Sequence, residues 1–221
     1  MVLLTWWSSS GQRVATRLLD VSLALTALVL VSPVMAVIAV AVKLSSAGPV
    51  LYRARRVGKV GRVFSLYKFR TMVIDADQTG PVITRSDDPR VTRIGRVLRR
   101  SKFDELPQLV NILNGSMSLV GPRPEDPGYV RLYSADQRRV LEVKPGITSP
   151  ATVLHRDEES MLTGEDWERK YRTEILPEKL RIELEYLSRR TVGGDLRILA
   201  QTAAALFRRP RLHRRESSWR I

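Results

Sequence analysis

The chain has 221 residues, which is enough for one domain of ordinary size and an appendage. It carries 37 Lys and Arg against 23 Asp and Glu, a formal charge of +14, so its expected partners are polyanions, phosphates or an anionic membrane surface. The absence of cysteine excludes disulfides and thiolate metal sites, and two histidines are too few to favour a histidine-based zinc site. Any chemistry is therefore expected to depend on carboxylates, Lys and Arg.

A run of uncharged, mostly apolar residues, 21–42, dominates the N-terminal part of the chain. It is long enough for a membrane helix, because roughly 20 apolar residues span a bilayer. A cleavable signal peptide is the weaker alternative, since its apolar region is only about 7–15 residues long. Pro33 lies in the middle of the run and should kink the helix, and the hydroxyl of Ser32 can bond to the carbonyl that Pro33 frees.

The residues of this run leave two membrane topologies open. Arg13 and Arg17 precede it and Lys43 follows it, and the positive-inside rule favours the cytoplasmic side for both basic flanks. A helix-break-helix hairpin that enters one leaflet meets this constraint. A kinked helix that spans the bilayer is equally compatible, because membrane helices tolerate proline. Asp20, at the entrance to the run, is expected to pair with Arg17 or with a basic residue further along.

The next stretch changes to short strands with many cations. Residues 50–52 and 63–67 are expected to form strands around a turn at 58–61. Most of the cations here are expected to face anionic lipid headgroups. Lys68 and Arg70 differ, because they alternate with aromatic residues and can both point from one face of a strand into a site.

An adjacent acidic pair, Asp104 and Glu105, follows a run in which almost every ionisable residue is a cation. Two carboxylates in a basic setting are predicted to have low pKa values, and an ionised carboxylate can serve as a nucleophile or a metal ligand. A capping carboxylate paired with a neighbouring arginine is the structural alternative. Pro107 predicts the start of a helix, and the rigid turn Gly121–Pro124 should fix the direction of Arg123.

Helical patterns dominate the remainder of the chain. Helices are expected at three places, with Asp195 capping the last: residues 129–143, 178–187 after Pro177, and 196–207. Residues 144–148 predict a turn, and the arginine-rich end predicts a solvated or lipid-contacting tail. The overall expectation is an α+β, mainly helical fold in three parts: a membrane-embedded helix-break-helix at 1–46, a catalytic domain at 47–207 and a basic tail at 208–221.

Several sequence blocks resemble, in order and spacing, the bacterial sugar transferases, which are monotopic polyprenyl-phosphate phosphoglycosyltransferases. They extend over about residues 13–202 and comprise Ser32-Pro33, Gly48–Arg53, Tyr67–Met72, Asp88–Arg90, Asp104–Leu109, Met117–Glu125 and Lys144–Thr148. The chain resembles the minimal catalytic form, without the N-terminal multi-helix membrane domain of larger relatives. One departure is local: many members have Ser-Leu before the acidic pair, where this chain has Lys102-Phe103.

The resemblance implies an enzyme at the cytoplasmic face of the bacterial inner membrane. Such an enzyme transfers a sugar-1-phosphate from a nucleoside diphosphate sugar, expected to be a UDP-sugar, to undecaprenyl phosphate and releases the nucleoside monophosphate. It also implies a re-entrant helix, Asp104 as the nucleophile that forms a phosphosugar intermediate, and Glu105 as the Mg²⁺ ligand. The expected substrate-binding residues are Lys68, Arg70 and Arg123, and Pro122 and Pro124 are expected to fix the direction of Arg123.

Some features remain open. The sugar, the nucleotide and the glycan pathway cannot be chosen from the residues, although exopolysaccharide or lipopolysaccharide synthesis fits the family, and a homodimer is compatible with the chain. The rival hypothesis is a non-catalytic, basic, membrane-anchored protein that binds anionic lipid or nucleic acid. It explains the charge of +14 but not an acidic pair inside a basic stretch, so no nucleic-acid partner is expected.

Overall fold

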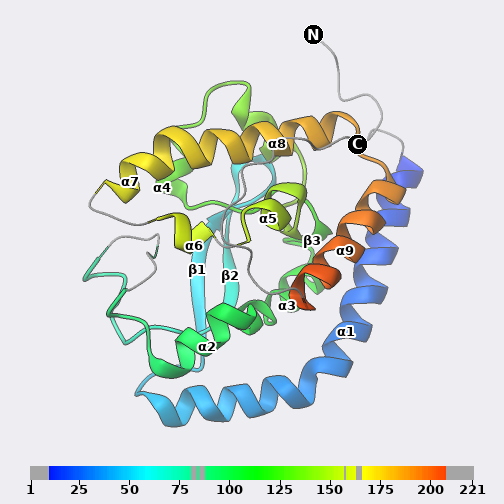
Figure 1. The fold of residues 1–221 in the computed structure, drawn as a ribbon. Coiled ribbons are helices and arrows are strands. Elements are labelled where there is room, and N and C mark those ends of the chain that lie inside the picture. The colour runs from blue at the N-terminus through cyan, green and yellow to red at the C-terminus, as the bar shows by residue number, and fades with distance from the viewer. Residues whose placement is uncertain (1–9, 81–83, 85–87, 157, 163–165, 208–221) are drawn as a thin grey trace.

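A computed structural model describes residues 10–80, 84, 88–156, 158–162 and 166–207. The basic tail predicted at 208–221 lies outside the described residues. The described part is mainly helical with a few short strands, as the sequence predicted, and the strands form two small two-stranded sheets. Figure 1 shows the long first helix bordering one side of the molecule and turning beneath it, while the other helices surround the central strands.

The apolar run forms one bent helix, α1 (Ser10–Ser45), rather than two helices separated by a break. The hydroxyl of Ser32 donates to the carbonyl of Val29 at 2.8 Å, which is the acceptor that Pro33 leaves without an N–H partner. The predicted kink and its hydroxyl contact are therefore confirmed. Of the helices in the described residues, α1 is the one long and apolar enough to cross a membrane, and within its most apolar window only 11% is buried. Whether it is re-entrant stays a prediction.

The basic stretch after α1 forms an antiparallel hairpin of β1 (Leu51–Val57) and β2 (Val63–Phe69). Its register pairs Leu51 with Phe69 and Val57 with Val63, so both strands are longer than predicted. The connecting turn η2 (Lys59–Gly61) has positive φ at Val60 and Gly61. The hairpin presents Lys68 near the end of β2.

Helices lie on both sides of the acidic pair, and the helix predicted to start at Pro107 is confirmed. Helix α2 (Arg93–Ser101) starts at Thr92, whose hydroxyl accepts from the amide of Gly95, and α3 (Gln108–Leu113) follows Pro107. The short helix η3 (Phe103–Glu105) lies between them and carries both carboxylates. Asn114 and Gly115 end α3, with a positive φ at Gly115.

A small parallel sheet, which the sequence did not predict, holds the turn that carries Arg123. Strand β3 (Ser118–Val120) pairs with β4 (Gly146–Thr148), where only a turn was expected. The backbones touch just beyond it: a Cβ on Gly146 would lie 2.1 Å from the amide nitrogen of Gly121, so no side chain fits there.

The C-terminal half is a layer of helices over the hairpin. Its elements are α4 (Pro127–Val130), η4 (Gln137–Glu142), α5 (Pro150–Leu154), α6 (Glu158–Met161), α7 (Trp167–Lys170), η5 (Tyr171–Ile175), α8 (Leu176–Ser188) and α9 (Val192–Phe207). The single helix predicted at 129–143 is wrong, because the side chains and amides of Ser134 and Gln137 bond to each other and divide it into α4 and η4. Thr191, not Asp195, bonds the first turn of α9.

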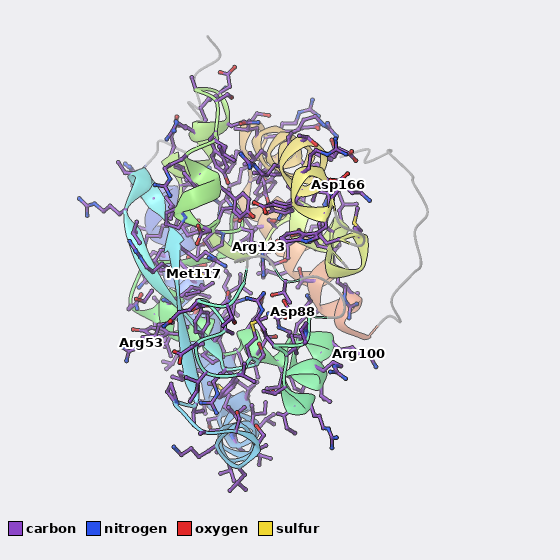
Figure 2. All side chains as sticks on the ribbon, turned by 90° about the vertical axis from the view of Figure 1, so that its left-hand side faces the viewer. Arg53, Asp88, Arg100, Met117, Arg123 and Asp166 are labelled. Carbon is purple, nitrogen blue, oxygen red and sulfur yellow. The ribbon has the colours of Figure 1, made fainter. Side chains whose placement is uncertain are left out.

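Two apolar clusters form most of the interior. One contains Tyr129, Trp167, Tyr171, Leu180 and Ile198, with the rings of Tyr129 and Tyr171 edge to face. The other joins α1 to the hairpin and α3 through Ala24, Ala54, Leu66, Ile112 and Met117, the last of which lies inside the molecule in Figure 2. Because α1 contributes to this second cluster, its first part is packed on the domain that follows it.

Two polar residues fix α1 to the segments on either side of the site. The guanidinium of Arg17 donates to the carbonyls of Ile112 and Leu113 at 2.6 and 2.9 Å, at the end of α3. The carboxylate of Asp20 accepts from the hydroxyl of Ser118 and the amide of Leu119 at 2.8 and 2.9 Å. The structure thus corrects the expected pairing of Asp20 with a basic residue: both of its oxygens hold β3.

Asp20→Ala is expected to lower the free energy of unfolding by roughly 2–4 kcal/mol, because it removes two hydrogen bonds to a charged acceptor and leaves the amide of Leu119 without a partner. Thermal or denaturant unfolding of the purified protein in detergent measures the change. Asp136→Ala, at an exposed aspartate without a side-chain cap contact, is the matched control and should change stability little. Equal stability of the two variants would contradict this anchoring.

Candidate active site

Glu105 lies between two cations that come from different parts of the fold. Its Oε1 is 2.8 Å from Nζ of Lys68 on β2 and 2.6 Å from a guanidinium nitrogen of Arg123. A second guanidinium nitrogen of Arg123 lies 3.4 Å from Oε2, so the arginine contacts both oxygens. Three segments, β2, η3 and the turn after β3, therefore meet at one carboxylate.

Local geometry brings each of these residues to the site. Asn111 on α3 accepts from the amide of Tyr67 and donates to the carbonyl of Ser65, which fixes α3 along β2 next to Lys68. The turn that carries Arg123 is held by the amide of Gly121, which donates to Thr148, and by the carbonyl of Pro122, which accepts from Gly146. Pro122 and Pro124 are buried and restrict this turn as expected.

Asp104 is the more buried member of the pair, at 6% exposure. Its Oδ1 is enclosed and has no hydrogen-bond partner among the described residues. Burial raises the pKa of Asp104, and the nearby charge of Glu105 adds to this effect, while Lys68, Lys102 and Arg99 oppose it. The prediction of a low pKa for both carboxylates is therefore wrong for Asp104, because the sequence shows its charged neighbours but not its desolvation.

For Glu105 the same prediction is confirmed. Burial favours its neutral form, but the charges of Arg123 and Lys68 and their hydrogen bonds outweigh that effect and hold the pKa of Glu105 well below its usual range. The two neighbouring carboxylates thus differ: Glu105 is ionised and paired, whereas Asp104 has an oxygen that no protein group uses.

Arg70 is not brought to the pair. One nitrogen of its guanidinium donates to the carbonyl of Ser46 at 2.7 Å, to the hydroxyl of Ser46 and, at 3.3 Å, to the carbonyl of Val42. Its hydrogen bonds thus go to the end of α1 and the residue after it, while Lys68, two residues earlier, reaches Glu105. The structure therefore corrects the expectation that both cations point into one site.

A second charged network, which sequence reasoning missed, lies behind Arg123. Lys179 on α8 is 3.2 Å from a carboxylate oxygen of Glu125 and 2.8 Å from one of Glu158, and the hydroxyl of Tyr171 donates to Glu125 at 2.6 Å. Burial lowers the pKa of Lys179, but the two carboxylates outweigh it and raise the value overall. In the sequence, the only indication of this network was Lys179 within the apolar stripe of a helix. A lysine at such a position is equally compatible with the surface.

Glu183, one turn after Lys179, supports the Arg123 turn directly. It accepts hydrogen bonds from the hydroxyl of Ser149 and from the main chain of Arg123, and its Oε2 is enclosed without a partner. Burial raises the pKa of Glu183 to about 7, against the opposing effect of those bonds and of Lys179. Figure 2 shows Arg123 inside the molecule, whereas Arg53 and Arg100 lie at its edges.

A cavity of about 350 Å³ opens beside Glu105 and Arg123. Its lining comes from α1, α3, β4, α5 and α9, in addition to the site itself. Charged residues, among them Lys102, Glu158 and Lys179, gather at one end, and Ala27, Val31 and other apolar residues form the rest. The volume is within the range of small-molecule sites, about 300–1,000 Å³.

The residues fit a magnesium ion only if a substrate supplies part of its coordination. No group of three or more histidine or acidic side chains that could hold a metal occurs within the ranges that the structure describes. The acidic pair offers the enclosed Oδ1 of Asp104 and the Glu105 carboxylate. Magnesium commonly binds one or two carboxylates together with phosphate oxygens and water, so this donor set suits it when a phosphate is present.

A long apolar helix packed on a basic site with an unused carboxylate oxygen defines a membrane-associated class of protein whose site is suited to phosphate groups. The Bacterial sugar transferase family model matches residues 11–209. The chain belongs to this family.

Similar proteins include three named undecaprenyl-phosphate transferases. Two are UDP-glucose:undecaprenyl-phosphate glucose-1-phosphate transferases: the one from Escherichia coli (strain K12) is 37% identical over 88% of this chain and 40% of its own length, and the one from Xanthomonas campestris pv. campestris is 41% identical over 88% and 39%. A UDP-N-acetylgalactosamine-undecaprenyl-phosphate N-acetylgalactosaminephosphotransferase from Aeromonas hydrophila is 43% identical over 63% of this chain and 34% of its own length. The chain thus spans less than half the length of these relatives.

The raised pKa of Glu183 predicts a pH dependence of stability. The folded state holds the proton of Glu183 up to about pH 7, whereas the unfolded chain releases it near the ordinary glutamate pKa of 4.5. The proton therefore stabilises the folded state fully below pH 4.5, and this stabilisation is lost as the pH rises through about 7. Between these values the loss approaches about 1.4 kcal/mol per pH unit.

Glu183→Gln is expected to remove this part of the pH dependence. Unfolding curves at pH 5, 6, 7 and 8 for wild type and variant isolate the effect, since other groups cancel in the difference. Glu185→Gln, at an exposed glutamate on the same helix, is the control and should retain the wild-type slope. If the free energy of unfolding of Glu183→Gln kept the wild-type dependence on pH, the raised pKa of the buried Glu183 carboxyl would be contradicted.

Proposed function

We propose that the chain transfers a sugar-1-phosphate from a nucleoside diphosphate sugar, expected to be a UDP-sugar, to undecaprenyl phosphate, and releases the nucleoside monophosphate. This reaction starts the synthesis of a glycoconjugate or exopolysaccharide. The observation that carries the proposal is the enclosed, unbonded oxygen of Asp104 next to a glutamate that is already paired with Lys68 and Arg123. Membership of the family and the names of the relatives support the substrate classes.

In the first step, a carboxylate oxygen of Asp104 attacks the phosphorus that carries the sugar. A bond forms between this oxygen and phosphorus, and the bond from phosphorus to the bridging oxygen breaks. The electron pair of that bond leaves with the nucleoside monophosphate. An oxygen that accepts no hydrogen bond from the described residues loses no such bond when it attacks.

In the second step, a phosphate oxygen of the polyprenyl phosphate attacks the same phosphorus. The bond between phosphorus and Asp104 breaks, and the carboxylate is regenerated. The product is a polyprenyl diphosphate sugar. Two displacements at one carboxylate replace a single displacement between two anionic substrates, and each requires only in-line placement and neutralised phosphate oxygens.

Lys68 and Arg123 are the proposed phosphate-binding residues. In the structure both contact Glu105, and each has further donors that a phosphate oxygen can use. Arg123 suits two phosphate oxygens at once because its donors are fixed in a planar fork. Glu105 holds both cations in place through its contacts with them, so it orients them whether or not it also binds a metal.

Magnesium, when bound with the substrate, would supply positive charge to the diphosphate oxygens. Glu105 is the residue that would hold it, with the remaining positions filled by phosphate oxygens and water. This assignment is a proposal from the donor set. The chain itself contributes the carboxylates, the two cations and the enclosed surroundings of Asp104.

The membrane setting of the reaction is also proposed. The exposed apolar side chains of α1, among them Leu25, Leu30 and Val37, fit the interior of one leaflet, with both ends of the helix at the cytoplasmic face. A polyprenyl phosphate has its phosphate at the membrane surface, where the site would lie. A non-catalytic basic protein that only binds lipid would not need a buried acidic residue without a partner.

Asp104→Asn is expected to lower turnover by a factor of about 10⁴ or more, because the amide cannot act as the nucleophile. The assay supplies undecaprenyl phosphate, magnesium and a panel of UDP-sugars, and measures nucleoside monophosphate release. Asp166→Asn, at an aspartate whose side chain is 76% exposed, is the control and should retain activity. Absence of release by the wild type with every nucleotide sugar would contradict the proposed function.

Arg123→Lys keeps the charge but loses the planar fork. We expect kcat/KM for the nucleotide sugar to fall about 10- to 100-fold, the value of one hydrogen bond to a charged group. Arg100→Lys, at an exposed arginine on α2, is the matched control. Equal kinetics for the two variants would mean that Arg123 does not bind the diphosphate.

A further inference from the structure

The lining of the cavity beside the carboxylate pair has a charged part and an apolar part, its polar and apolar ends. The charged part includes Glu105, Arg123 and Lys102, and the apolar part includes Ala27, Val31 and Ala205. The apolar end therefore lies between α1, the helix long enough to enter a membrane, and the last turns of α9. A ligand that fills both ends must join an anionic group to a hydrocarbon.

Helices α1 and α9, which form the apolar end of the cavity, lie close together at one place and separate toward the cavity. Leu23 of α1 and Leu196 and Leu199 of α9 line a small void of about 20 Å³, where the helices lie close together. Further along, Figure 1 shows them diverging, and the residues that face the cavity from this pair are Ala27, Val31, Thr202 and Ala205. Their small side chains leave room for a chain to pass between the helices.

This apolar wall continues into the surface of α1 that fits a bilayer. Leu30 and Val34, each three residues after one of the wall residues Ala27 and Val31 and therefore beside them on the helix surface, are 72% and 45% exposed. A hydrocarbon in the cavity can therefore reach the lipid phase without crossing a charged surface. A nucleoside diphosphate sugar, which is polar along its whole length, gains nothing from such a wall.

Lys102 provides an unused cation at the polar end. Its ammonium makes no hydrogen bond or ion pair with any residue that the structure describes, although its charge acts on Asp104. Its backbone is left-handed, with φ of 61°, between α2 and η3, so the residue occupies a fixed corner two positions before the nucleophile. The other two cations nearby, Lys68 and Arg123, are already paired with Glu105.

We propose that this cavity is the acceptor site, in which the first isoprene units of a polyprenyl phosphate lie between α1 and α9 and its phosphate is bound by Lys102. The proposal rests on the proposed function and adds the location and the binding residues of the second substrate. It divides the cations between the substrates: Lys68 and Arg123 serve the donor diphosphate, and Lys102 serves the acceptor phosphate.

Photo-crosslinking tests the location without requiring turnover. The full chain in nanodiscs is irradiated with a polyprenyl phosphate that carries a diazirine in an early isoprene unit, and labelled peptides are identified by mass spectrometry. The expected labels lie on residues 24–31 and 198–205, and an excess of unmodified polyprenyl phosphate removes them. Labels confined to other faces of α1, or unaffected by the competitor, would overturn the proposal.

Filling the cavity tests its role in the reaction. Ala27→Leu and Ala205→Leu are expected to raise the KM for polyprenyl phosphate about tenfold or more and to leave the KM for the nucleotide sugar unchanged. Ala36→Leu and Ala204→Leu make the same change at exposed positions of the same helices and are the matched controls. An effect on the nucleotide sugar alone would assign the cavity to the donor and overturn the proposal.

Lys102 is tested by removing and restoring its charge. Lys102→Gln is expected to raise the KM for polyprenyl phosphate, Lys102→Arg to restore it, and neither to change the KM for the nucleotide sugar. An unchanged acceptor KM, or an effect on the donor alone, would overturn the assignment of Lys102. If the wild type releases nucleoside monophosphate, the proposed function stands whatever these variants show, so the two proposals fail separately.

Discussion

The contact of Glu105 with Lys68 and Arg123 is the interaction on which the site depends. It joins β2, η3 and the turn after β3, three segments far apart in sequence, at one carboxylate. The charges of the two cations offset the cost of burying Glu105 and keep it ionised. Glu105 is therefore engaged in ion pairs with both of them. Asp104, next to it, has no ion-pair partner among the described residues, and its enclosed Oδ1 accepts no hydrogen bond from them. The two adjacent carboxylates thus lie in two different electrostatic environments.

The long apolar helix α1 belongs to this site as much as the strands do. Arg17 bonds the end of α3, which follows the acidic pair, and Asp20 bonds β3, which precedes Arg123. Ala27 and Val31 then form part of the cavity wall. The position of α1 and the position of the carboxylates are therefore mechanically connected.

Local signals in the sequence predicted the local structure well. The hairpin, the start of α3 at Pro107 and the bend at Pro33 all depend on residues within a few positions of each other. The failures concern features set by distant residues. The alternation of Lys68 and Arg70 with aromatic residues predicted that both cations point into one site. The guanidinium of Arg70 instead donates to the carbonyl of Ser46, directly after α1. The pKa of Asp104 depends on burial, which charge patterns do not reveal, and Lys179 and Glu183 reach the site from α8, more than 50 residues beyond Arg123.

The most direct test of the account is the location of the covalent intermediate. The wild-type protein is incubated with its nucleotide sugar and magnesium but without acceptor, treated with borohydride to reduce any acyl phosphate, and digested for mass spectrometry. The account predicts that the residue at position 104 is converted from aspartate to homoserine, and that added polyprenyl phosphate before reduction prevents this. Reduction at Glu105 instead, or nucleoside monophosphate release with no modified carboxylate, would contradict the central claim.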